Sequence, residues 1–176
     1  FRNEAHLRDT VGRMLAPLGK RVDALCPYVD ARLPDGSRLN VVIPPLATQG
    51  WTVTIRRFRQ EPLSLGTLAA NGMMSPEMAD FLTVLVKVRA NLLVAGAAGS
   101  GKTTLLNALC ACIAPERERV ITIEDSQELR LPDIHCVALE ARTANLEGLG
   151  EVTIRQLVRN ALRMRPDRIV VGEVRG

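Results

Sequence analysis

The sequence predicts an α/β protein in which a parallel, doubly wound sheet follows a smaller α+β unit. Three continuous aliphatic runs rich in β-branched residues, at 91–95, 120–123 and 169–171, are typical of the buried strands of parallel sheets. Helical patterns at 102–113 and 153–164 separate these runs. Strands that alternate with helices favour a parallel sheet covered by helices on both faces.

The N-terminal part of the chain has a different pattern. Apolar residues at helical spacing predict a helix over residues 3–18. Alternating apolar and polar residues then predict three strands, near 29–33, 39–43 and 51–55. We therefore expect a first α+β domain over residues 1–58.

The two patterns meet in a segment that has no strand alternation. Pro62 and Gly66 interrupt the chain there, so we expect a linker over residues 59–66 and a second domain over residues 67–176. Ser75 and the proline after it predict the start of a helix that runs to about residue 89, because serine suits the N-cap and proline the first turn.

Composition limits the possible functions without selecting one. The 176 residues are 47% hydrophobic but only 3% aromatic, so the core must be aliphatic. The net charge of +4 fits nucleic acid, anionic lipid or nucleotide phosphates, although a solvated arginine surface explains it equally well. Four cysteines without a C-x-x-C pair, and two histidines, favour buried free thiols over a zinc site.

A glycine-rich loop follows the first aliphatic run. Residues 96–103, GAAGSGKT, match the pattern G-x-x-x-x-G-K-[ST] in full, between an expected strand and an expected helix. Lys102 would reach the β- and γ-phosphates of a nucleotide and Thr103 would bind Mg²⁺, so ATP and Mg²⁺ are the expected cofactors. The residues expected to contact the nucleotide are Ala97, Ala98, Gly99, Ser100, Gly101, Lys102, Thr103 and Thr104.

Carboxylates end the other two aliphatic runs. Glu124 and Asp125 follow the second run, and Glu173 follows the third. In an open parallel sheet, ligands bind beyond the carboxyl ends of the strands. One carboxylate could activate a water molecule while another holds the metal through a water molecule. The alternative is that Glu124 and Asp125 form an ordinary polar strand end.

Several arginines could contact phosphate. Arg56 ends the third expected strand, directly before the linker, and Arg57 follows it. An arginine at such a hinge could reach the γ-phosphate and couple domain closure to the nucleotide state. Arginines at 155, 159 and 163 form a basic stripe on a predicted helix, which is either a solvated face, a subunit contact or a phosphate contact.

Five stretches together resemble a known family over nearly the whole chain. They read DARLPDGSRLNVVIPPLA, TIRRF, GSGKTTLLNAL, TIEDSQELRL and LVRNALRMRPDRIVVGEVRG. They resemble the ATPases of type II and type IV secretion systems, and within these the Tad/Cpa-type pilus-assembly ATPases most closely. The Gly172-Glu173 pair is the form that this family carries.

The resemblance implies a RecA-like ATPase domain joined by a flexible linker to a mobile N-terminal domain. It implies a homo-hexamer at the cytoplasmic face of the inner membrane, where ATP turnover drives pilin assembly or export through a membrane platform protein. Glu124 would be the catalytic base and Glu173 the Walker B glutamate, which acts together with Lys102. Arg56 or Arg57, and Arg142, would contact phosphate.

One departure from the family bears on activity. The family has a histidine box after the Walker B strand, and this chain stops at Gly176. We therefore expect a piece of a longer protein, incomplete after Walker B, that binds nucleotide weakly and hydrolyses it poorly. Two alternatives remain: a nucleic-acid motor of a conjugation-type system, and a nucleotide-binding scaffold without turnover. No specific nucleic-acid partner is expected from the resemblance.

Overall fold

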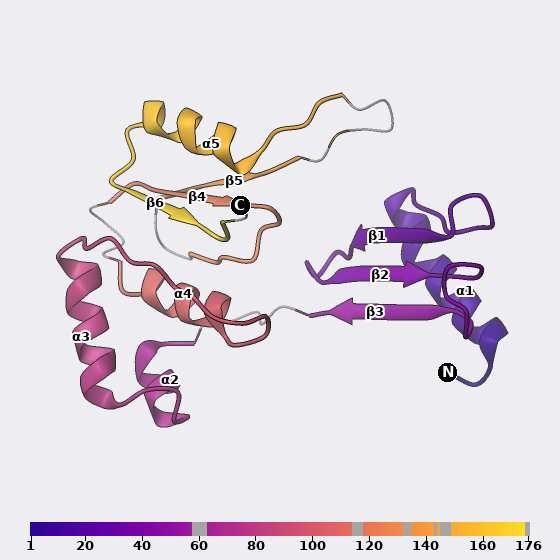
Figure 1. Cartoon of the computed structure of the whole chain (residues 1–176), viewed down its shortest axis with the longest axis horizontal. Helices are drawn as coiled ribbons and strands as arrows, with labels where there is room; N and C mark the ends of the chain where they lie inside the picture. The colour runs from indigo at the N-terminus through magenta and orange to yellow at the C-terminus, as the bar shows by residue number, and fades with distance from the viewer. Residues whose placement is uncertain (58–62, 114–117, 132–134, 143, 145–148, 175–176) are drawn as a thin grey trace. The chain divides into compact units, whose positions relative to one another are not determined.

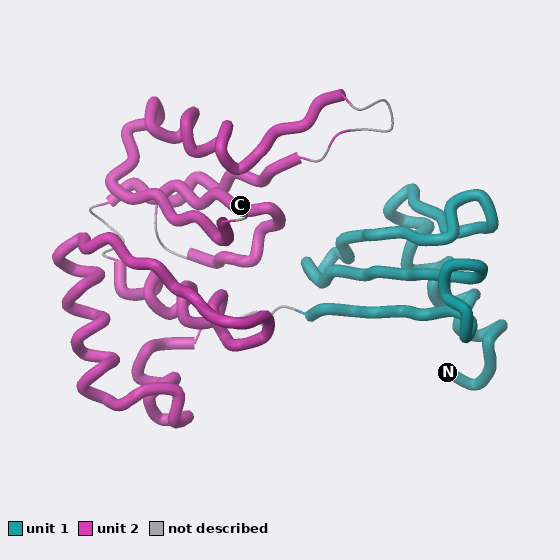
Figure 2. Tube along the Cα trace, in the orientation of Figure 1, with its two compact units in different colours: residues 1–59 teal, residues 60–176 magenta. Residues whose placement is uncertain are grey.

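The chain folds into two compact units, Phe1–Arg59 and Gln60–Gly176 (Figure 2). The computed structural model describes residues 1–57, 63–113, 118–131, 135–142, 144 and 149–174. Much of the expected linker at 59–66 therefore falls outside the described residues. A helix that was not expected, α2, begins at Leu65, because the Ser64 hydroxyl accepts a hydrogen bond from the Thr67 N–H (3.0 Å) and caps it.

The first unit is a three-stranded antiparallel sheet with one helix. Its elements are α1 (Glu4–Leu15), a 3₁₀ turn (Ala16–Leu18), β1 (Tyr28–Arg32), β2 (Arg38–Val42) and β3 (Thr52–Arg56). The sheet order is β1-β2-β3. Val11 and Leu15 of α1 pack with Leu39 and Val41 of the central strand, which buries all four side chains. This unit agrees with the expected α+β domain.

The described part of the second unit contains a parallel sheet and four α-helices (Figure 1). Its strands have the order β5-β4-β6, and β4 is buried along its whole length. The strands are β4 (Val120–Glu124), β5 (Cys136–Glu140) and β6 (Arg168–Val171), and the helices are α2 (Leu65–Ala70), α3 (Pro76–Lys87), α4 (Lys102–Cys110) and α5 (Ile154–Ala161). The expected α/β class, a parallel sheet after a small α+β unit, is confirmed.

Helices α4 and α5 cover opposite faces of this sheet (Figure 1). Val120 packs with α4, whereas Ile121 and Ile123 pack with α5. Because side chains alternate along a strand, Thr122 and Glu124 belong to the same face as Val120. This alternation places Glu124 on the α4 side of the sheet.

The first aliphatic run does not form the expected strand. Residues 91–97 are in no helix or strand, Leu93 is 89% exposed, and Val94 alone of the run packs against the aliphatic core. A strand exists only where a neighbouring strand pairs with it, and β6 pairs with β4 alone among the described strands. The prediction of a strand over 91–95 is therefore wrong for this structure.

Two further expectations need correction. The helix expected over 153–164 ends earlier, because α5 stops at Ala161; Leu162 lies in the 3₁₀ turn that follows and is 66% exposed. The four cysteines are free thiols, yet only Cys110 is buried and Cys26 is exposed. Within the described residues, no helix is both long and apolar enough to cross a membrane.

Candidate nucleotide site

The glycine-rich loop turns sharply before it enters α4. Gly99 and Gly101 have φ angles of +74° and +89°, a region that residues with a side chain rarely adopt. Gly101 is the N-cap of α4 and provides no side-chain cap, so the first N–H groups of this helix have no side-chain partner at the cap. Such a helix start is suited to an anion, because its N–H groups and the helix dipole both favour negative charge.

The beginning of the loop also requires glycine. A Cβ atom on Gly96 would lie 2.6 Å from the Ser100 Oγ atom. The Ser100 side chain therefore folds back against the Gly96 backbone, and the loop closes into a tight curve. In phosphate-binding loops, the backbone curves in this way so that its N–H groups can come close to the phosphate.

Lys102 places its charge against this curve. Its Nζ atom donates a 2.7 Å hydrogen bond to the Ala97 carbonyl oxygen at the other side of the loop. The ammonium group therefore lies at the loop backbone, where a phosphate held by the loop N–H groups could exchange for the carbonyl. Thr103 follows in the first turn of α4, half-buried.

Glu124 is a buried carboxylate at the tip of β4. It is only 4% exposed, and its Oε1 atom accepts hydrogen bonds from the N–H groups of Glu128 (2.9 Å) and Leu129 (3.0 Å). Burial raises the pKa of Glu124, the two N–H groups oppose this, and the nearby charges of Glu128 and Glu140 add to it. A carboxylate with a raised pKa accepts a proton more readily, as a general base must.

Gly172 gives the Glu124 side chain its space. A Cβ atom on Gly172 would lie 2.8 Å from the Cγ atom of Glu124. The Gly172 N–H donates to the Ile123 carbonyl (2.9 Å), which continues the pairing of β6 with β4 to this point. The glycine of the Gly-Glu pair is therefore required for a steric reason, because a side chain at position 172 would meet Glu124. Glu173 follows directly at the same ends of the strands and is half-buried.

Asn107 links the acidic segment to the loop helix. Its Oδ1 atom accepts a hydrogen bond from the Arg130 N–H (3.0 Å), and its Nδ2 donates to the Thr103 carbonyl (3.1 Å). Leu129, beside Arg130, donates to Glu124. Sequence reasoning missed this residue, although an amide within the aliphatic stretch LLNAL was a usable signal.

Lys102 and Thr103 thus begin the helix that covers the sheet face to which Glu124 belongs. Asn107 connects this helix to the segment that bonds Glu124. Its side chain accepts a hydrogen bond from the Arg130 N–H, and the N–H of the preceding residue, Leu129, donates to Glu124. Asp125 is exposed just beyond the strand. Among the described residues, no group of three or more His, Cys, Asp or Glu side chains is arranged to hold a metal. A site of this composition fits Mg²⁺ that is bound mainly by phosphates and a hydroxyl rather than by a protein cage.

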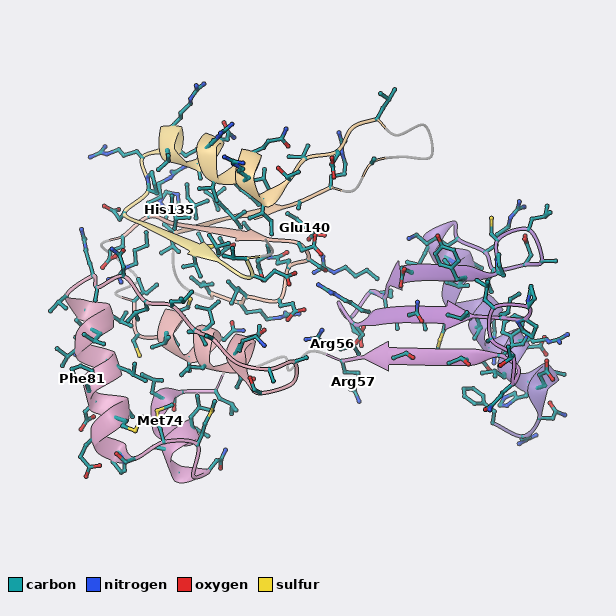
Figure 3. The ribbon with its side chains drawn as sticks, in the orientation of Figure 1. Arg56, Arg57, Met74, Phe81, His135 and Glu140 are labelled. Atoms are coloured by element: carbon teal, nitrogen blue, oxygen red, sulfur yellow. The ribbon has the colours of Figure 1, made fainter. Side chains whose placement is uncertain are left out.

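The candidate arginines lie in three different settings. Arg56 is the last residue of β3 and Arg57 follows it, both in the first unit (Figure 3). Arg142 belongs to the second unit, where its Nε donates a 2.6 Å hydrogen bond to the Gly150 carbonyl. Arg155 and Arg159 are exposed on α5, the helix on the sheet face opposite α4, and Arg163 lies in the 3₁₀ turn after it.

Together, the α/β sheet, the glycine-rich loop and the buried acid are features typical of the phosphate-loop class of proteins. The chain belongs to the family of type II/IV secretion system proteins, whose family model matches residues 1–176. This establishes the resemblance that the sequence motifs indicated.

Individual relatives agree with the family. A putative conjugal transfer protein of Mycobacterium tuberculosis strain H37Rv is 46% identical over 182 residues, which cover 100% of this chain and 51% of that protein. The type IV secretion system protein PtlH of Bordetella pertussis is 40% identical, over 85% of this chain and 50% of that protein. The chain spans about half the length of these curated relatives.

A solved structure shows the same fold. The X-ray structure of the Legionella pneumophila ATPase DotB matches 98% of this chain and 48% of its own chain, with a TM-score of 0.60 and 23% sequence identity. The likeness shows that the chain shares the fold of that ATPase.

Proposed function

We propose that the chain is the nucleotide-binding part of an ATP-hydrolysing secretion motor. The observation that carries the proposal is the position of Glu124, a buried carboxylate of raised pKa on the same sheet face as the glycine-rich loop and α4. A phosphate-binding loop alone would fit any nucleotide-binding protein. A proton acceptor beside it adds the capacity to activate water.

In this proposal, each residue has a separate task. The N–H groups of residues 97–104 bind the phosphates, and Lys102 exchanges its bond to the Ala97 carbonyl for the β- and γ-phosphates. Thr103 binds Mg²⁺, and Glu173 holds the metal through a water molecule. Mg²⁺ supplies charge neutralisation for the phosphate that is transferred. Glu124 accepts a proton from the attacking water.

A second part of the proposal assigns phosphate contacts to arginines. Arg56 ends β3 of the first unit and Arg57 follows it, directly before the segment that joins the units. An arginine that reached the γ-phosphate from there would couple nucleotide state to the position of the first unit. Arg142, the third candidate, would have to exchange the hydrogen bond from its Nε atom to the Gly150 carbonyl for one to phosphate.

We further propose that the protein works as a homo-hexamer on the cytoplasmic side of the inner membrane. In that setting it would bind a membrane platform protein and drive export of pilin or another substrate. The names of its relatives, a type IV secretion system protein and a putative conjugal transfer protein, support a role in secretion.

Steady-state phosphate release separates a motor from a binding scaffold. Glu124→Gln should bind Mg·ATP like the wild type and lose turnover on the order of 100-fold or more, the scale of a lost general base. Lys102→Ala should lose binding itself. If the wild type binds Mg·ATP but releases no phosphate in the assembled protein, the chain is a nucleotide-binding scaffold and the motor proposal fails.

A nucleic-acid motor is the second candidate. The net charge of +4 and the name of the mycobacterial relative favour it. Stimulation of ATP turnover by duplex DNA, with binding that weakens steeply as salt increases, would support this reading. Stimulation by anionic vesicles without any response to DNA would favour secretion.

A further inference from the structure

A rigid turn at the end of α2 fixes the position of Met73. Gly72 has a φ angle of +77°, its N–H donates to the Ala69 carbonyl (2.9 Å), and the Met73 N–H donates to the Leu68 carbonyl (3.0 Å). These two bonds form a Schellman motif, the standard glycine-dependent helix ending. The buried side chains of Leu65 and Leu68 anchor the helix in the aliphatic core, so the direction in which Met73 leaves the turn is determined.

The Met73 side chain lies against the last glycine of the phosphate loop. A Cβ atom on Gly101 would lie 3.2 Å from the Met73 Cε atom. The methyl group therefore covers Gly101 where this residue has its positive φ angle and begins α4.

The neighbouring methionine shows that this placement is not explained by core packing. Met74 is partly buried against the aliphatic core (labelled in Figure 3), whereas Met73 remains 43% exposed. The exposed Met73 instead contacts Gly101, whose conformation orients the N–H groups at the start of α4.

We propose that Met73 is a positioning residue for the phosphate-binding loop. Its methyl group limits the conformations available to Gly101, so that the loop N–H groups keep the orientation that binds phosphate. Met73 acts through Gly101 and does not itself contact the nucleotide. The inference rests on the proposed nucleotide function and adds a residue that lies outside the loop motif, about 25 positions before it in the chain.

The test compares Met73→Ala with Met73→Leu and with Met78→Ala in the full chain. Met78 is a matched control, since it is also an exposed methionine (56%) of the same unit but lies on α3. Binding of inorganic tripolyphosphate and of a non-hydrolysable Mg·ATP analogue would be measured by calorimetry, together with the melting temperature without ligand.

We expect Met73→Ala to weaken binding of both ligands by a similar factor, on the order of tenfold, as when a supporting residue of a binding site is removed. Met73→Leu should restore most of the affinity, Met78→Ala should bind like the wild type, and all variants should melt within a few degrees of one another. Wild-type affinity in Met73→Ala would overturn the inference. Loss of the ATP analogue with unchanged tripolyphosphate binding would also overturn it, because Met73 would then contact the base or ribose.

Failure of the proposed nucleotide function would give a different binding result from failure of the Met73 role alone. If the wild type binds neither tripolyphosphate nor the ATP analogue, the loop is not a phosphate site and both proposals fail together. If the wild type binds both and the Met73→Ala variant binds them equally well, only the positioning role is lost.

Discussion

Glu118 and Arg168 form a buried ion pair that joins the segment before β4 to the first residue of β6. The Arg168 Nη2 atom lies 3.0 Å from Glu118 Oε1, and its Nε atom bonds the second carboxylate oxygen. The side chains are only 7% and 13% exposed. Two parallel bonds between planar groups give this pair strict geometry, and it holds together the strands whose far ends carry Glu124 and Glu173.

Removal of one partner of this pair should destabilise the fold. Arg168→Met leaves the Glu118 carboxylate buried without its partner, and we expect a loss of about 3 kcal/mol in the free energy of unfolding. Arg89→Met is the control, since Arg89 lies 3.8 Å from the same carboxylate but is 54% exposed, and it should cost less than about 1 kcal/mol. Equal effects of the two changes in urea unfolding would contradict the buried-pair interpretation.

The Glu118–Arg168 pair also predicts how the free energy of unfolding changes at acidic pH. The hydrogen bond from Arg168 is the main reason that the pKa of Glu118 lies below its ordinary value of 4.5. A carboxylate with a lowered folded-state pKa stabilises the fold above the unfolded-state pKa, and this contribution is lost as the pH falls through the folded-state value. Unfolding at a series of pH values below 5 should therefore show a steeper loss of stability in the wild type than in Glu118→Gln.

The contribution of Glu124 to stability should depend on pH in the opposite direction. Its pKa is raised because of burial, so its stabilising contribution is present at low pH and is lost as the pH rises through the folded-state value. Relative to the wild type, Glu124→Gln should therefore gain stability between pH 4 and pH 8. Unfolding free energies measured at both pH values test this expectation.

Gly172→Ala should disturb the site by a steric route. The new methyl group would lie 2.8 Å from the Glu124 Cγ atom, so the strand or the carboxylate must shift. We expect a loss of about 1–3 kcal/mol, typical of overpacking, together with lower ATP turnover. Gly66→Ala is a suitable control, because it lies in α2 with its nearest contact 3.8 Å away and should be neutral or slightly stabilising. A neutral Gly172→Ala variant would argue against the close packing of β6 on Glu124.

Cysteine reactivity provides a further check on the sheet and its helix. Burial raises the pKa of the Cys110 thiol to about 12, so at pH 8 this group should not react with a disulfide reagent while the protein is folded. Cys26 is exposed and should react rapidly. Cys26→Ser should remove the rapid phase and Cys110→Ala should leave it unchanged. A rapid phase that depends on Cys110 would mean that α4 does not cover the sheet as described.

Local signals in the sequence were sufficient where the structure depends on neighbouring residues. The cap at Ser75, the turn of the glycine-rich loop and the aliphatic run that became β4 all follow from residues a few positions apart. Hydrogen bonds between such residues form in the same way in almost any tertiary context, so the pattern predicts them.

Tertiary structure decided what depends on distant partners. Residues 91–95 and 136–140 are both short apolar stretches, yet only the second pairs with β4 and becomes a strand. The steric need for Gly172 appears only when β6 lies beside Glu124. The sequence alone thus determined the family, and it predicted the turn of the glycine-rich loop and the carboxylates that follow the second and third aliphatic runs. Which strands pair, and which side chains share a face, depend on the free energy of contacts between residues far apart in the chain, and a local pattern does not contain that information.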